Sequence, residues 1–419
     1  MPVRRPGRTG TLPGLRWAGL GPARGCAGLA VAAGFGVWLY VGPARPESAA
    51  ARFLGTADYL EERAEEGLES GTPRDRAEAM ALMRQALLRD PASPYRWSTM
   101  GELLAESGDN ERARYCFRRA VELGPNVPPV LMRAANFHFT HGAVREGLEC
   151  TRKILGLVRD YDGIVFSTCE RMGVGVAEVI ANGMPADRAA HTALLRHLLA
   201  REAAADAAVA WRWLEGRQEC DTALTSQYVE FLLKHTAYSD AREVWARHLG
   251  RQSPDYPGSD RVFNGGFESE PLKEGLDWQV TPAEGVSADR GAGGRSGRWS
   301  LHIRFEGQSN LDYRHISQRV VAEPGAYRFS AWVRADAVTT DEGVRFRIRD
   351  AGGDPRVDVT TAQVVGTTQW TELAAVVIVP APVRLLAVEL IRRPSLKFDN
   401  KISGTVWVDD VRLEPARGR

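Results

Sequence analysis

The feature that most limits how this chain can fold is a two-helix pattern that recurs after 34 residues. Between residues 93 and 125, apolar and small residues recur three or four positions apart in two blocks, with a polar segment at 107–110 between them. This spacing predicts two helices joined by a tight turn. A chain that repeats such hairpins is expected to stack them into an α-solenoid. The recurring residues are Ala113, Phe117, Ala120 and Pro125, with Ala79, Met83, Ala86 and Pro91 as their counterparts 34 residues earlier.

The same spacing resembles the tetratricopeptide repeat (TPR). Residues 97–101 read W-x2-M-G, and A-x3-F-x2-A with a later proline follows at 113–125. Leu104 stands where the family has tyrosine, which keeps an apolar side chain there. The resemblance implies a solenoid over residues 50–255 with a protein partner on the concave face of its first helices. Candidates for that face are Tyr95, Glu102, Met132, Asn136 and Phe139, and the alternative is that all five are ordinary surface or packing residues.

An uncharged apolar run of 18 residues lies near the N-terminus, at 25–42. Five arginines and no acidic residue precede it. A run of this length predicts a transmembrane helix, and the preceding arginines predict a cytoplasmic N-terminus with the rest of the chain exported to the periplasmic or extracellular side. A cleaved signal peptide is the alternative. We therefore expect residues 1–49 to form a cytoplasmic N-terminus and a signal anchor.

Total charge and cysteine content narrow the functional classes. The net charge of +1 gives no reason to expect a nucleic-acid partner.

Cys116 and Cys150 hold equivalent positions in neighbouring hairpins, where an exported domain could join them in a disulfide or use both as small apolar fillers. The five cysteines include no CxxC pair or zinc-type cluster. No HExxH, G-x-S-x-G or P-loop motif occurs either, so we expect a protein that is not an enzyme.

The hydrophobic pattern changes period after a linker at residues 256–260. Residues 327–334 and 344–349 alternate apolar and polar side chains, as half-buried strands do. Further short strands are expected at 376–379, 383–390 and 405–413, with Gly, Pro and Asp between them. Many short strands predict an antiparallel β-sandwich or jelly roll. The expected fold is therefore a transmembrane helix, an α-solenoid and a jelly roll over residues 261–415, with a tail at 416–419.

Three segments of this half resemble the galactose-binding-like jelly rolls that serve as carbohydrate-binding modules. They read NGGFE at 264–268, PGAYRFSAWV at 324–333 and VWVDDVRL at 406–413. The resemblance implies a structural calcium ion that joins the first and last strands, and calcium prefers oxygen ligands. The matching carboxylates are Glu268, Asp409 and Asp410. The alternative is that backbone N–H groups satisfy these carboxylates.

Alternation also separates an inner face from an outer face of the strands. Phe329, Ala331 and Val333 are expected in the core with Val344, Phe346 and Ile348. The outward set contains Ser330, Arg349, His302 and Arg304, together with the residues that we predict to bind a glycan, which are Trp332, Arg328, Arg334, Arg345 and Arg347. Aromatic rings stack on sugar rings and arginine pairs with carboxylates, so one basic face of this kind would suit an acidic polysaccharide. The alternative is a solvated face on which Trp332 is covered.

These features predict a non-catalytic, membrane-anchored scaffold on the exported side of a membrane. Its solenoid would bind a protein partner and its jelly roll an envelope or extracellular polysaccharide. One alternative is a scaffold that binds proteins alone, and another is a glycan-processing enzyme with an unrecognised site.

Overall fold

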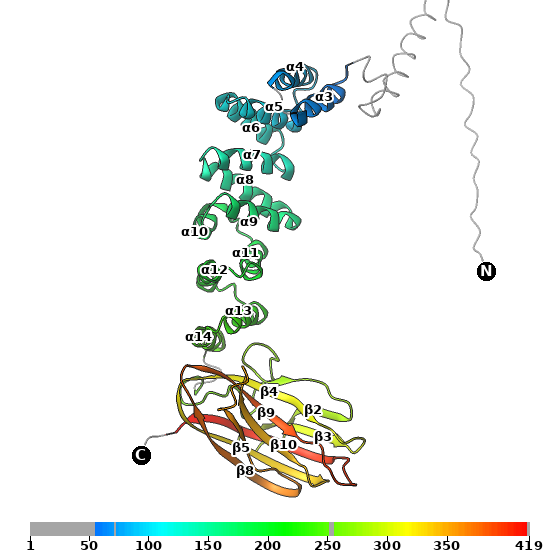
Figure 1. The fold of residues 1–419 in the computed structure, drawn as a ribbon, viewed down its shortest axis with the longest axis vertical. Helices are drawn as coiled ribbons and strands as arrows, with labels where there is room; N and C mark the ends of the chain where they lie inside the picture. The colour runs from blue at the N-terminus through cyan, green and yellow to red at the C-terminus, as the bar shows by residue number, and fades with distance from the viewer. Residues whose placement is uncertain (1–54, 71–72, 251–254, 417–419) are drawn as a thin grey trace, which may run out of the picture. The chain divides into compact units, whose positions relative to one another are not determined.

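The computed structural model describes residues 55–70, 73–250 and 255–416 (Figure 1). The chain forms two compact units, one up to Ala190 and one from His191 onwards. The predicted signal anchor at 25–42 and the arginines before it lie outside the described residues. Within the described ranges, no helix combines the length and the apolar character that crossing a membrane requires.

The first unit is helical, as the sequence predicts. Its hairpins form because Pro residues open several helices, and Ser93 and Asp109 cap α5 and α6 by accepting hydrogen bonds from the Arg96 and Arg112 amides. The elements are α3 (Ala57–Ser70), α4 (Pro73–Arg89), α5 (Pro94–Glu106), α6 (Asn110–Leu123), α7 (Pro128–Thr140), α8 (Val144–Leu157), the 3-10 helix η1 (Arg159–Tyr161), α9 (Asp162–Arg171), α10 (Val176–Glu178), the π-helix η2 (Val179–Gly183) and the start of α11 (Arg188–Ala200).

The hairpins are held by large side chains that fill the space left by small ones. A Cβ on Gly101 of α5 would lie 2.9 Å from the ring of Phe117 on α6. In the next hairpin the glycine is on the second helix and the large side chain on the first. A Cβ on Gly147 of α8 would lie 2.5 Å from the ring of Phe139 on α7. Phe117 and Phe139 are both buried. This packing is the physical basis of the 34-residue pattern.

The second unit begins with helices and ends with strands. Its helices are α11, α12 (Ala204–Gly216), α13 (Thr222–Lys234) and α14 (Tyr238–Leu249). Its strands are β1 (Gln279–Val280), β2 (Val286–Ala292), β3 (Trp299–Glu306), β4 (Tyr313–Ala322), β5 (Gly325–Val338), β6 (Val344–Asp350), β7 (Asp358–Thr360), β8 (Gly366–Val379), β9 (Arg384–Arg392) and β10 (Ser403–Pro415).

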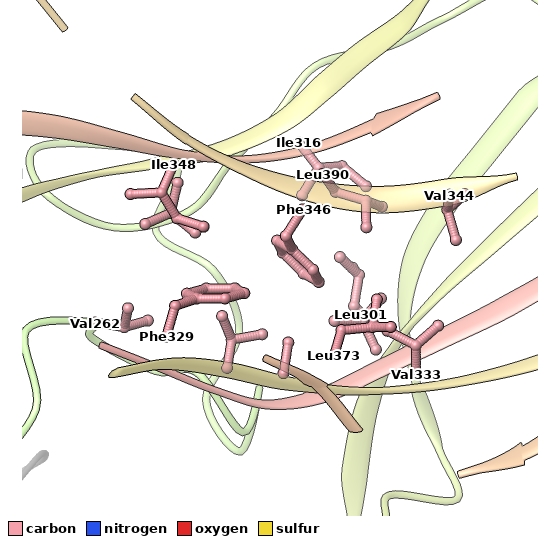
Figure 2. Packing of buried hydrophobic residues seen from close by; sticks show 14 of the residues in the cluster. Val262, Leu301, Ile316, Phe329, Val333, Val344, Phe346, Ile348, Leu373 and Leu390 are labelled. Atoms are coloured by element: carbon pink, nitrogen blue, oxygen red, sulfur yellow. The ribbon is translucent and has the colours of Figure 1, made fainter. Parts of the chain in front are cut away.

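The strands form two antiparallel sheets of five strands each, which confirms the predicted β-sandwich. One has the order β1-β4-β9-β6-β7 and is called here the β4 sheet, and the other has the order β2-β3-β10-β5-β8 and is called the β5 sheet. The predicted core residues are buried between the two sheets. Figure 2 shows Phe329 and Phe346 next to each other in this core. Their ring centroids are 5.2 Å apart, and the rings are tilted by 51° to one another.

Helices α13 and α14 pack against the sandwich within this unit. Trp245 of α14 is fully buried, and its ring fills the space in which Gly275 would carry a Cβ. The Gly275 amide donates a hydrogen bond of 2.9 Å to Ser226 Oγ of α13. Arg242 of α14 pairs with Glu323, which follows β4. These contacts attach the end of the helical segment to one end of the sandwich.

Candidate functional site

The predicted basic face does not exist as one surface. Strand β5, with Arg328, Trp332 and Arg334, belongs to the β5 sheet, whereas β6, with Arg345 and Arg347, belongs to the β4 sheet. Both strands turn their apolar residues into the same core, so their polar residues lie on opposite outer faces of the sandwich. The prediction was wrong here because alternation separates inside from outside but does not tell which sheet a strand joins.

The arginines of β6 are also neutralised by partners. Arg345 pairs with Glu342, and Arg347 forms two hydrogen bonds of 2.7 and 2.8 Å with Asp358. Arg349 donates twice to Glu389, at 2.7 and 3.0 Å. The outer face of the β4 sheet therefore presents paired charges and not the free arginines that an anionic ligand would need.

The outer face of the β5 sheet gathers aromatic rings around one arginine. Arg334 of β5 lies over two indole rings, with its guanidinium carbon 4.1 Å from the ring centroid of Trp407 and 5.4 Å from that of Trp370. His302 of β3 lies beside Trp407 with its ring centroid 5.8 Å away. We call the set His302, Trp332, Arg334, Trp370 and Trp407 the tryptophan face. All five side chains are half-buried.

Strand register explains why these residues meet. On β10, Val406 and Val408 point into the core, so Trp407 between them points out. Trp407 pairs with His302 of β3 on one side and with Arg334 of β5 on the other. Antiparallel neighbours that face each other across strands lie close enough for ring and guanidinium contacts. Three strands far apart in sequence thus place one cluster on one face.

The arginines of this face differ in whether they have carboxylate partners, and Asp289, Glu306 and Asp336 lie on the same face. Arg328 pairs with Glu372 at 2.6 Å, and Arg295 stacks on Trp332 at 3.6 Å while pairing with Asp410 at 2.8 Å. Within the described part of the chain, no carboxylate pairs with Arg334 or with the exposed Arg304 of β3. Two arginines on this face are therefore available to an anionic ligand.

His302 adds a neutral polar group to the same face. Burial, together with the nearby Arg334 guanidinium, lowers the pKa of His302. Its Nε2 atom lies 3.1 Å from Ser300 Oγ. The imidazole is consequently neutral at pH 7 and can exchange hydrogen bonds with hydroxyl groups without adding charge.

The sequence analysis assigned Trp332, Arg334 and His302 to an outward face, but it assigned neither Trp407 nor Trp370 to one. Trp332 and Arg334 follow from the alternation of β5, and His302 from that of β3. Trp370 lies where the register between β5 and β8 shifts, between the pairs Val333–Thr371 and Ala335–Thr368. An irregular register breaks the period of two, so alternation gave no signal for this ring.

The carboxylates expected to bind calcium are occupied by hydrogen-bond donors. Glu268 Oε1 accepts from the Arg298 and Trp299 amides at 2.9 Å each. Asp409 Oδ2 accepts from the Arg295 and Ser296 amides at 2.6 and 3.1 Å, and burial raises the pKa of Asp409 to about 6.

Asp410 receives the Arg295 guanidinium and the Ser296 hydroxyl, at 2.8 and 2.6 Å. In the ranges that the structure describes, no group of three or more His, Cys, Asp or Glu side chains is arranged to hold a metal ion. The donors around these carboxylates do not fit a cation as they stand. Calcium binding stays a prediction.

The candidate partner residues of the first unit differ in accessibility. Tyr95 is 45% exposed, while Met132 and Asn136 are half-buried. Glu102 accepts from Arg133 Nε at 2.7 Å. Phe139 is only 7% exposed because it packs on Gly147, so its role is in the core and not in partner contact. The protein partner stays a prediction.

The two cysteines of the neighbouring hairpins do not form a disulfide in this structure. Cys116 and Cys150 are both free and buried. Burial raises the pKa of each thiol to about 11, which keeps both protonated and unreactive at pH 7. Their role here is that of small apolar fillers, which was the alternative prediction.

Comparison with solved structures matches part of this chain to several carbohydrate-binding modules. No family model matches the chain, and no curated protein sequence matches it. A solved xylan-binding domain, CBM22-1 of Paenibacillus barcinonensis Xyn10C, is 19% identical with a TM-score of 0.25, over 37% of this chain and 94% of that one.

Two further solved structures give similar values. A CBM4 structure is 17% identical with a TM-score of 0.26, over 37% of this chain and 99% of that one. A second CBM22 xylan-binding domain is 14% identical with a TM-score of 0.26, over 39% of this chain and 99% of that one.

Proposed function

We propose that the tryptophan face binds a polysaccharide that carries acidic groups. The observation that carries this proposal is Arg334, which is held between Trp407 and Trp370 and has no carboxylate partner in the described part of the chain. A half-buried arginine without a counter-ion is costly unless a ligand or a π-system compensates its charge. The two indole rings compensate part of the cost of the unpaired charge. They leave the guanidinium without a carboxylate partner in the described part of the chain.

The geometry suits a sugar acid for two reasons. The Arg334 guanidinium lies over the two rings, and a guanidinium can bind a carboxylate or sulfate through two parallel hydrogen bonds. The half-buried indoles offer apolar surface against which the C–H face of a pyranose ring can pack. His302 beside them offers a neutral partner for hydroxyl groups. Arg304 on the same sheet supplies a second positive charge for a neighbouring sugar acid.

We further propose that the chain acts as a non-catalytic scaffold on the exported side of a membrane. The support is the apolar run at 25–42 with its preceding arginines, and the absence of a recognisable catalytic motif from the sequence. In this arrangement the sandwich holds the polysaccharide, and the helical unit is left for a protein partner. A scaffold that binds proteins alone is the alternative that the experiment below must exclude.

The test is binding of the purified full chain to a panel of defined polysaccharides. The panel pairs polygalacturonate and alginate, which are polyuronates, with neutral xylan and cellulose. The expected result is binding to a polyuronate that weakens as salt is added. A folded chain that binds no member of the panel would overturn the proposal in favour of the protein scaffold.

Two variants localise the site. Trp407→Ala removes one support of Arg334 and should weaken polyuronate binding by about tenfold or more, the size expected when a hydrogen bond to a charged group loses its geometry. Arg347→Gln removes the same charge from the opposite outer face, where Asp358 already pairs with it, and should leave binding unchanged. Equal effects of the two variants would place binding elsewhere.

A further inference from the structure

A loop between β9 and β10 holds two large apolar side chains out in solvent. Leu396 and Phe398 are 102% and 105% exposed, which means that the fold shields neither of them. The next most exposed large apolar residue of the described chain, Leu88, is 79% exposed. Exposing such side chains is unfavourable in water, so a pair at one loop tip indicates a binding surface.

The base of this loop is built around a buried charge. Arg392, at the end of β9, is fully buried and donates to Leu311 O at 2.6 Å, Glu342 O at 3.1 Å and Asn400 O at 2.9 Å. It also donates to Asn310 Oδ1 at 2.7 Å. One guanidinium thus ties three loops together, because its fixed fork of donors reaches all of them.

A second set of hydrogen bonds fixes the approach to the tip. Ser395 is buried, its hydroxyl donates to Asp341 Oδ1 at 2.6 Å, and its amide donates to Asn310 Oδ1 at 2.9 Å. The Lys397 amide donates back to Ser395 Oγ at 3.1 Å. The backbone bends at 397–399, and Leu396 and Phe398 are the sequence neighbours of Lys397, whose amide is anchored on Ser395. Leu396 and Phe398 are therefore exposed on a loop that these hydrogen bonds hold in place.

The loop lies at the end of the sandwich away from the helices of its own unit. Ala322 pairs with Arg384 at one end of β4 and β9, and Tyr313 pairs with Arg392 at the other. The end near Ala322 is the one where Glu323 contacts Arg242 of α14. The tip therefore lies at the end of the sandwich opposite to the contact between Glu323 and Arg242.

The charges at the tip are mixed, with a small excess of basic residues. The segment from 393 to 401 holds Arg393, Lys397 and Lys401 against the acid Asp399, and Asp341 of the neighbouring loop adds a second acid. Lys397 is 3.4 Å from Asp341 but remains 71% exposed. Long basic side chains of this kind can keep their charge at a lipid headgroup while neighbouring apolar residues go deeper.

We propose that Leu396 and Phe398 insert into the interfacial region of a membrane that contains anionic lipids. Two fully exposed side chains need no matching pocket to become buried in a bilayer, whereas a protein partner would have to supply one. The three basic residues favour an anionic surface. The inference is independent of glycan binding, since the tip shares no residue with the tryptophan face.

The experiment measures hydrogen exchange of the full chain with vesicles, resolved to the peptide that covers 393–402. Total vesicle binding is not informative, because the run at 25–42 is expected to enter any bilayer. The expected result is that amides at the tip exchange about tenfold more slowly with vesicles of phosphatidylcholine and phosphatidylglycerol, as burial at the headgroup boundary excludes water. Vesicles of phosphatidylcholine alone should protect the tip less.

Variants decide whether the protection depends on the tip. Leu396→Ser with Phe398→Ser should abolish it without unfolding the chain, because both side chains are fully exposed. Leu88→Ser removes an exposed apolar residue from the helical unit and should change nothing at the tip. Unchanged exchange at 393–402 with both kinds of vesicle, or protection that survives the double substitution, would overturn the proposal.

Discussion

Replacing Gly147 with alanine is expected to destabilise the helical unit, although alanine is the better helix former. Gly147 holds the position at which the preceding hairpin has Ala113. Its backbone φ is not positive, so an alanine would meet no backbone strain. Its Cβ would instead lie 2.5 and 2.6 Å from Cε1 and Cδ1 of Phe139, closer than packed atoms approach. The ring of Phe139 is itself buried and has little room to move.

The two opposing effects have known sizes. Exchanging glycine for alanine within a helix gains about 0.8–1 kcal/mol. Forcing an extra methyl group into a packed core costs about 1–3 kcal/mol. Because the contact is with a buried ring, we expect the upper part of that range and a net destabilisation of about 1–2 kcal/mol.

A double-mutant cycle separates the clash from other effects. Phe139→Leu leaves a gap beside Gly147, and the alanine methyl should partly fill it. The double variant should then be more stable than the sum of the single effects predicts, by about 1 kcal/mol or more. Gly163 of α9 has open space where a Cβ would stand, so Gly163→Ala should be neutral or stabilising and serves as the control.

The assay is urea denaturation followed by circular dichroism, with hydrogen exchange of α8 amides to localise the effect. The chain has two units, so a single global transition is not assumed. If Gly147→Ala stabilised α8 as much as helix propensity alone predicts, the packing explanation of the repeat would be refuted.

Three further perturbations test other parts of the account. Trp245→Ala should cost about 3–5 kcal/mol in urea denaturation, because a fully buried ring that packs on Gly275 is lost. Burial raises the pKa of Asp277 to about 6, so folding favours its protonated form and this contribution to stability is lost as pH rises through about 6. Asp277→Asn should therefore flatten the dependence of Tm on pH between about 4 and 7. Arg392→Met should lower the stability by about 3 kcal/mol or more, measured in urea, because it removes the buried guanidinium that donates to carbonyl groups of three loops.

The sequence predicted the local structure well, because the spacing of apolar residues in helices and strands follows directly from which side chains pack in the core. Small and large residues at helical spacing predicted the hairpins, and alternation predicted the core residues from Phe329 to Ile348. Phe139 was placed on a partner surface because the repeat pattern does not show that Gly147 leaves a hole for its ring.

The candidate site was harder to predict because it depends on how strands pair. The sequence could not show that β5 and β6 join different sheets, since the same alternation fits either arrangement. It also could not show that Arg347 and Arg349 have partners in Asp358 and Glu389. Free and paired arginines look alike in a sequence, and only the fold tells them apart.

The most direct test of the central claim is the affinity of the full chain for polygalacturonate with two arginines replaced in turn. Arg334→Gln removes the unpaired guanidinium between Trp407 and Trp370, and Arg347→Gln removes a paired one from the opposite outer face. The account predicts that Arg334→Gln weakens binding about ten- to a hundredfold, as loss of a charged hydrogen-bonded pair does, and that Arg347→Gln leaves it unchanged. Unchanged affinity in Arg334→Gln, or weaker binding in Arg347→Gln instead, would contradict the claim that Arg334 binds the polysaccharide.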